Sequence, residues 1–164
     1  MSEDVLFVAE HRRGDLRDVS YEGISAGRQL ADALGGELHV AVISGPVEEF
    51  AESLDTPEVD VIHTVDAGEE FDHDTYAAAT EALHAELDPA ALLLPNSVNG
   101  LDYAPAVADS LGLPYATDAV DVAYDDGLTV TREMYGSKVE TTVDVAGDQF
   151  VVSIRGGEWP AADD

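Results

Sequence analysis

The clearest group of polar side chains follows an apolar run in the middle of the chain. Residues 90–94 are apolar throughout, and Asn96, Ser97 and Gly100 come next, before a helical pattern. The exposed N–H groups at a helix start favour an anion, so this loop could bind the phosphate of a cofactor. Asp102 adds a negative charge near the same helix start and would repel a phosphate. The sequence therefore leaves two interpretations open, a cofactor-binding loop or a capped helix start packed in an interface.

The few basic side chains are the second candidate group. Arg132, Lys138 and Arg155 belong to a set of seven basic residues set against 35 acidic ones. Arginine and lysine near an interface form paired contacts with carboxylate or phosphate groups. Tyr135 and Gly136 lie between the first two, and a glycine there is typical of a turn that needs positive φ. We expect these five residues either to shape a contact with a partner or to include cations that pair locally with acids.

Other kinds of chemistry find little support in the sequence. The absence of cysteine excludes disulfides, a thiolate nucleophile, an Fe–S cluster and a cysteine-based zinc site. The five histidines show no metal-ligand spacing, and the serines lack the Gly-x-Ser-x-Gly motif of a nucleophile elbow. These histidines are His11, His39, His63, His73 and His84. We predict no metal site and no catalytic residue, so any redox chemistry must come from an organic cofactor.

The charge balance is extreme, with a formal net charge of −28 at pH 7. Self-repulsion opposes compaction unless salt screens it, so a salt-rich, halophilic cytoplasm is the expected setting, with an acidic surface for a basic partner as the alternative. Binding to nucleic acid is not expected, because phosphate contacts need lysine and arginine. The acidic start lacks a signal-peptide pattern, and no apolar run approaches the roughly 20 residues that span a bilayer. We expect a cytoplasmic protein without a membrane contact.

The elements that must position these groups alternate between strands and helices. A chain of 164 residues with 45% apolar residues suits one domain with one sizeable core. Apolar runs predict strands at residues 4–9, 38–43, 59–65 and 90–94. Helices are predicted at 18–34, through 50–54, after a cap at Asp72 or Asp74, and up to Gly112 with Pro105 in the early turns. Such alternation predicts a doubly wound, mostly parallel sheet of the α/β class.

The last third of the chain has a different pattern. Residues 120–124 alternate between apolar and polar, and a hairpin signal at 125–127 leads to a return strand over 128–134. Another alternating run covers 139–145, and 150–154 follows a turn at 147–148. We predict that these segments form an antiparallel C-terminal extension of the parallel sheet.

Several segments resemble one known family in their order and spacing. They are Val5-Leu6-Phe7-Val8-Ala9-Glu10-His11 with a Gly14-Asp15-Leu16 turn after it, Asn96-Ser97 with Gly100-Leu101-Asp102-Tyr103-Ala104-Pro105, Thr117-Asp118, Arg132 with Tyr135-Gly136-Ser137-Lys138, and Ile154-Arg155-Gly156-Gly157. Together they resemble the amino-terminal domain of the alpha subunit of an electron-transfer flavoprotein. The resemblance implies a Rossmann-like fold of the adenine-nucleotide alpha-hydrolase type over residues 1–155, and an acidic tail or start of a linker over 156–164.

The resemblance also implies a function for the chain. The family's alpha subunit is about twice as long as this chain, and its second domain holds most of the FAD. The present domain would then be a structural platform for the beta subunit, which carries AMP in a related domain. FAD in the assembled complex would pass electrons between dehydrogenases and an acceptor. The domain by itself would be no enzyme and would bind FAD weakly or not at all.

Two alternatives remain from the sequence. The first is a free-standing adenine-nucleotide-binding domain of the same superfamily. The Ser-Gly-Gly-x-Asp-Ser loop of its hydrolases is missing, but Arg12 and Arg13 after the first strand could meet a phosphate. The second is a dimerisation module built on the exposed edge of the antiparallel extension.

Overall fold

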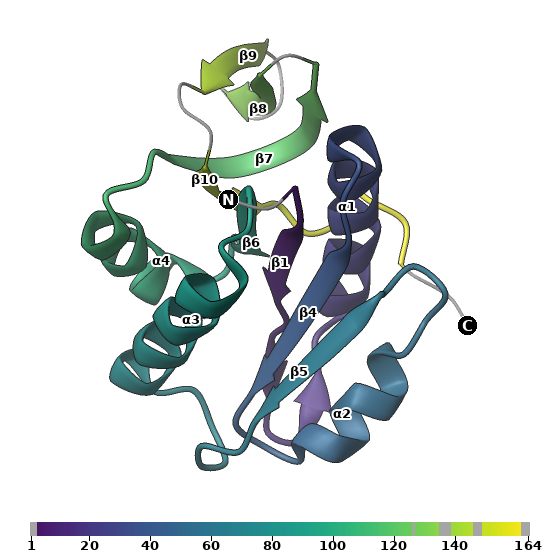
Figure 1. The fold of residues 1–164 in the computed structure, drawn as a ribbon, viewed down its shortest axis with the longest axis vertical. Helices are drawn as coiled ribbons and strands as arrows, with labels where there is room; N and C mark the ends of the chain where they lie inside the picture. The colour runs from purple at the N-terminus through teal and green to yellow at the C-terminus, as the bar shows by residue number, and fades with distance from the viewer. Residues whose placement is uncertain (1–2, 126, 135–138, 146–148, 162–164) are drawn as a thin grey trace.

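The computed structural model describes residues 3–125, 127–134, 139–145 and 149–161. In this part of the chain an eight-stranded sheet has the order β5-β4-β1-β6-β10-β7-β8-β9 (Figure 1). Its strands are β1 (Val5–Val8), β4 (Leu38–Ile43), β5 (Val61–Val65), β6 (Ala91–Pro95), β7 (Tyr115–Tyr124), β8 (Leu128–Met134), β9 (Val139–Val145) and β10 (Phe150–Ile154). The strands from β5 to β7 in this order pair in parallel, and β7, β8 and β9 pair antiparallel.

Four helices in the described residues cover the two faces of the sheet. They are α1 (Asp18–Leu34), α2 (Val47–Leu54), α3 (His73–Leu87) and α4 (Val98–Leu111). Figure 1 shows α1 and α2 on one side of the parallel strands and α3 and α4 on the other. One apolar cluster contains Val5 and Phe7, and a second contains Leu6 and Val8, because successive side chains of a strand point to opposite faces. The predicted α/β class with a doubly wound, mostly parallel sheet is confirmed.

Helix boundaries follow local capping chemistry. Gly35 ends α1 with a φ of 81°, and Asp72 caps α3 by accepting the Thr75 N–H at 3.0 Å. Pro105 departs from the prediction, because it lies inside α4 and not in its early turns. The reason is that Ser97 caps the helix well before the proline, so the helix already begins at Val98. Proline has no N–H to donate to the preceding turn, and Pro105 lies on the exposed side of α4.

The antiparallel extension is present, but it does not include β10. That strand pairs in parallel with β6 on one side and β7 on the other, so its assignment to the extension was wrong. All five residues of β10 are buried, as a strand covered on both faces requires. An irregular register in β7 also changes its inward face, where Ala119 and Val122 are buried and Val120 is only partly so.

Two short features complete the described structure. The residues after β1 form a small hairpin of β2 (His11–Arg12) and β3 (Asp15–Leu16), where the sequence predicted only a polar turn. Near the other end of the chain, Trp159 packs into the core cluster on the α1 side of the sheet. No helix in the described residues has the length and apolar character needed to cross a membrane.

Candidate functional site

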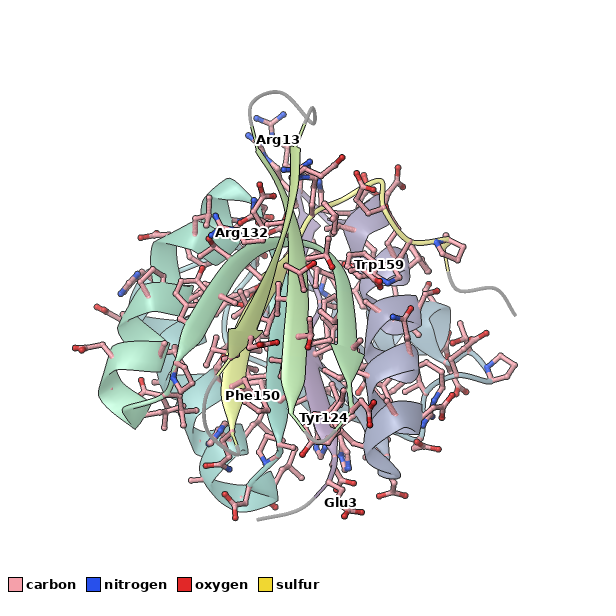
Figure 2. The ribbon with its side chains drawn as sticks, turned by 90° about the horizontal axis from the view of Figure 1, so that it is seen from above. Glu3, Arg13, Tyr124, Arg132, Phe150 and Trp159 are labelled. Atoms are coloured by element: carbon pink, nitrogen blue, oxygen red, sulfur yellow. The ribbon has the colours of Figure 1, made fainter. Side chains whose placement is uncertain are left out.

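The candidate site lies where the parallel strands end. Figure 2 shows Arg13 and Arg132 toward one end of the sheet, and Glu3 and Phe150, which precede β1 and begin β10, toward the other. In the strand order, β1 lies between β4 and β6. The chain therefore adds β4 and β5 on one side of β1 and β6 on the other, which makes β1 the point where the strand order switches direction. Open α/β sheets bind ligands at the carboxyl ends of strands beside such a switch point.

The loop after β6 is a helix cap with a carboxylate against it. Ser97 Oγ accepts the Gly100 N–H at 3.1 Å and donates its own proton to the Glu10 carboxylate. A side chain at Gly100 would place its Cβ 1.9 Å from the Pro95 carbonyl oxygen, so only glycine lets α4 begin this close to the strand. Glu10 is 7% exposed. A buried carboxylate therefore lies beside the helix start where the sequence suggested a phosphate.

The backbone fixes the position of Glu10. The Glu10 N–H donates to Ser20 Oγ at 2.8 Å, and the Ser20 hydroxyl donates to the Glu10 carbonyl at 2.6 Å. The Arg17 N–H donates to the same carbonyl at 3.0 Å. Because Ser20 is fully buried on α1, these bonds tie the end of β1 to the start of that helix.

Asn96 belongs to a second polar network, between β6, β10 and β7. Its amide Nδ2 donates to Asp118 Oδ1 at 3.0 Å, and its Oδ1 accepts the Ser153 hydroxyl at 2.9 Å. The Asp118 N–H closes the ring by donating to Ser153 Oγ at 3.0 Å. Asp118 has a φ of 57°, a left-handed conformation that aspartate tolerates better than most residues. The network lies where β7 and β10 change register.

Arg155 extends this network to β8. Its Nε and Nη2 donate to the two Asp118 carboxylate oxygens at 2.9 and 2.6 Å, and its Nη1 donates to Glu133 Oε1 at 2.9 Å. The hydrogen bonds from Arg155 lower the pKa of the Asp118 carboxyl. A bidentate pair of this kind has one geometry, so Arg155 holds three strands in register. The predicted interface cation thus pairs locally with two acids.

The structure places part of the predicted interface group beside Asp118. The charge of Arg132 also lowers the Asp118 pKa, after the larger effect of Arg155. Arg132 Nε is buried and has no hydrogen-bond partner among the described residues. Tyr135, Gly136 and Lys138 lie outside the described residues.

A cavity of about 410 Å³ lies beside the switch point. Two arginines and two glutamates take part in its lining, namely Arg12, Arg17, Glu10 and Glu70. The backbone N–H of Arg13 bonds both oxygens of the Glu70 carboxylate at 3.1 Å. The formal charges of these four lining side chains cancel, so the cavity does not present a simple cationic site for a phosphate.

A buried polar cluster lies next to this cavity and was not visible in the sequence. His11 Nε2 is within hydrogen-bonding distance of the Ile43 carbonyl, Ser44 Oγ and Tyr76 OH, at 2.9, 3.0 and 3.2 Å. Tyr76 donates to the Ile43 carbonyl at 2.7 Å, and burial raises the pKa of its phenol to about 12. The phenol is therefore protonated at neutral pH, and it joins α3 to β2 and β4. No short sequence motif reveals the cluster, because Tyr76 is 65 residues from His11.

Comparisons with known proteins agree with this architecture. Residues 5–164 match the family described as the electron transfer flavoprotein domain. An electron transfer flavoprotein subunit alpha from Methylophilus methylotrophus is 39% identical over 150 residues, covering 90% of this chain and 47% of that protein. One from Syntrophomonas wolfei is 32% identical over 151 residues, covering 90% of this chain and 46% of that protein. A protein named FixB from Azotobacter vinelandii is 31% identical over 137 residues, or 79% of this chain and 36% of that protein.

The match extends over nearly the whole chain, while the chain spans about half the length of the two alpha subunits. The segments that carry the resemblance also meet in space, since Asn96, Asp118 and Arg155 form one hydrogen-bonded network. The chain belongs to the electron transfer flavoprotein domain family.

Proposed function

We propose that this chain is the amino-terminal platform domain of an electron-transfer flavoprotein alpha subunit, which binds a beta subunit and leaves the flavin to another domain. The observation that carries the proposal is the buried Glu10 carboxylate beside the start of α4. An anionic phosphate placed there would face this negative charge. Ser97 and Gly100 are bonded to each other as a cap, so they support packing better than capture of a cofactor.

The proposal extends to the assembled complex. FAD would be bound mainly by a carboxy-terminal domain, and AMP by the beta subunit. The complex would pass electrons between dehydrogenases and an acceptor, and this domain would contribute no catalytic residue. Residues 1–155 would form the platform and 156–164 the start of a linker, with Trp159 of that segment still packed against the core.

The contact with the beta subunit would use the carboxyl end of the sheet and the antiparallel extension. Its candidate residues are Arg132, Tyr135, Gly136, Lys138 and Arg155. Arg132 supports this location as a basic side chain beside Asp118 whose Nε has no hydrogen-bond partner among the described residues, since arginines near an interface form paired contacts with carboxylate groups. The net charge of −28 supports a salt-rich cytoplasm and argues against nucleic acid as a partner.

A calorimetric titration with AMP, ATP and FAD in multimolar KCl tests the platform against its main alternative. The folded chain should release no heat of saturable binding with any of the three ligands, and circular dichroism confirms that it is folded. Saturable micromolar binding of FAD to the isolated chain, about −8 kcal/mol, would contradict the proposal.

The second candidate is a free-standing adenine-nucleotide-binding domain. It is favoured by the cavity beside the switch point and by the exposed arginines Arg12 and Arg17 in its lining. The same titration distinguishes this candidate from the platform domain. Micromolar binding of AMP or ATP that is lost in Arg12→Gln would establish the nucleotide-binding domain. Arg28→Gln is the control, because Arg28 pairs with Asp60 elsewhere on the molecule.

A further inference from the structure

Three side chains from two separate parts of the sequence come together at the amino-terminal edge of the sheet, where the parallel strands β1 and β4 begin. Asp4 precedes β1, Glu37 precedes β4, and His39 is the second residue of β4. The two strands are neighbours, and Leu6 pairs with His39 across them. This edge lies opposite the carboxyl ends that form the candidate functional site. Histidine spacing along the chain could not reveal the group, because only one of its members is a histidine.

The three side chains direct one ligand atom each toward a common point. His39 Nε2 lies 3.6 Å from Asp4 Oδ2 and 3.6 Å from Glu37 Oε1. The three atoms all lie within 4.8 Å of one another. Two hydrogen bonds hold the starts of β1 and β4 together: the Glu37 N–H donates to the side-chain Oδ1 of Asp4 at 2.8 Å, and the Val5 N–H donates to the Glu37 carbonyl at 2.9 Å.

The histidine supplies an independent observation. The His39 side chain is 8% exposed, and its Nε2 is buried with no hydrogen-bond partner in the part of the chain that the structure describes. A buried polar atom without a partner costs free energy, so its persistence needs an explanation. At 3.6 Å the two carboxylates are too far away for good hydrogen bonds.

The other nitrogen of His39 is already engaged. His39 Nδ1 lies 3.0 Å from His63 Nε2, and the two rings stack with centroids 5.2 Å apart. In the tautomer where Nδ1 carries the proton and donates to His63, the Nε2 lone pair of His39 faces the two carboxylates. The lone pair and the negatively charged carboxylates repel one another, and a cation bound between them would remove this repulsion. Metal-binding histidines commonly have their second ring nitrogen held by a hydrogen bond in this way.

We propose that Asp4, Glu37 and His39 form a binding site for a divalent cation of the zinc class. Ligands about 2.1 Å from a tetrahedral Zn²⁺ lie about 3.4 Å apart, close to the separation of 3.6 Å between His39 Nε2 and each carboxylate oxygen. One imidazole with two carboxylates suits zinc and its transition-metal neighbours better than magnesium or calcium, which prefer oxygen ligands alone. Glu37 is the exposed member, so an ion can reach the site from solvent and water can complete its coordination.

Metal titration of the full chain without a histidine tag tests the site. Binding of Zn²⁺ is measured by competition with a chromophoric chelator, and binding of Co²⁺ is measured by its visible absorption in a non-chelating buffer. We expect one ion per chain at a site that excess Mg²⁺ does not occupy. Asp4→Asn and Glu37→Gln should each weaken Zn²⁺ binding about tenfold or more.

The matched control is Glu48→Gln, which removes an exposed carboxylate on α2 and should leave Zn²⁺ affinity unchanged. Circular dichroism establishes that all variants are folded. The proposal is overturned if the wild type shows no single saturable site. It is equally overturned if Glu37→Gln binds Zn²⁺ as the wild type does, because the ion would then bind the acidic surface at large.

Discussion

Single residues at the carboxyl ends of the parallel strands determine what this part of the sheet can bind. The Glu10 carboxylate accepts a hydrogen bond from Ser97 at the start of α4, where related architectures expose backbone N–H groups to an anion. Its own backbone is held by Ser20 inside α1. The Ser97 hydroxyl and the Gly100 N–H, two groups that a phosphate could use, are therefore engaged where β1, α1 and α4 meet.

Removal of the Ser97 hydroxyl should destabilise the fold. Ser97→Ala loses the helix cap and leaves a buried carboxylate with one fewer donor, so we expect a loss of about 1–3 kcal/mol in the free energy of unfolding. Denaturant unfolding in multimolar KCl measures it. Ser110→Ala is the control, since Ser110 also donates to a glutamate, Glu81, but in an exposed pair. A loss in the control as large as in Ser97→Ala would contradict the account of Glu10.

Asp118 should contribute to stability in a pH-dependent way. Its pKa in the folded state is lowered by the hydrogen bonds from Arg155, so the unfolded state binds more protons in acid. This contribution is present above the unfolded pKa of about 3.9 and is lost as pH falls through the lower folded value. The stability gap between wild type and Asp118→Asn should therefore shrink as pH falls below about 4. Thermal unfolding at a series of pH values measures the gap, and two parallel curves would contradict the assignment.

At the scale of elements, the sequence predicted most of the parallel part of the fold. The bounds of α1 and β4 were predicted without error, because Gly35 ends the helix and an uninterrupted apolar run defines the strand. β10 was misplaced because it follows β9 along the chain, and adjacent strands commonly pair. Four of its five residues are apolar and successive ones are buried on both faces, which was the correct signal, since only a strand covered on both faces buries Phe150 and Val151 alike.

The candidate site was predictable only in part. Asn96 and Ser97 were singled out because they follow a buried strand, and Arg155 because basic residues are few in this acidic chain. Their pairing with Glu10 and Asp118 was not predicted, because Glu10 lies 87 residues from Ser97 and Asp118 lies 37 residues from Arg155. Contacts of this range depend on strand order, which residue patterns along one chain do not specify.

The start of α4 should be intolerant of any side chain at Gly100. Gly100→Ala places a Cβ against the Pro95 carbonyl, a backbone atom that cannot move without shifting β6, so we expect a loss of about 2 kcal/mol or more. Gly156→Ala is the matched control, because its Cβ would meet only Val19 atoms at 3.8–3.9 Å. That control should change stability by about 0.5 kcal/mol or less. Chemical denaturation compares the two, and equal losses would contradict the close-approach argument.

For the molecule as a whole, the net negative charge has the largest influence on how stability depends on salt. A net charge of −28 on one domain repels itself, and salt reduces the repulsion because the Debye length falls to about 3 Å at 1 M. The midpoint of thermal unfolding should therefore rise steadily from low salt to multimolar KCl. Circular dichroism at a fixed pH measures it. A midpoint that does not change with KCl would contradict the expected adaptation to salt.

A platform domain for a beta subunit should associate with that subunit in solution. The chain is mixed with the electron-transfer flavoprotein beta subunit of the same organism in multimolar KCl, and light scattering after size-exclusion chromatography gives the mass. We expect a one-to-one complex that Arg132→Glu weakens and that Glu48→Gln, on the distant α2, leaves intact. A folded chain that elutes alone, at its own mass and in the presence of excess beta subunit, would contradict it.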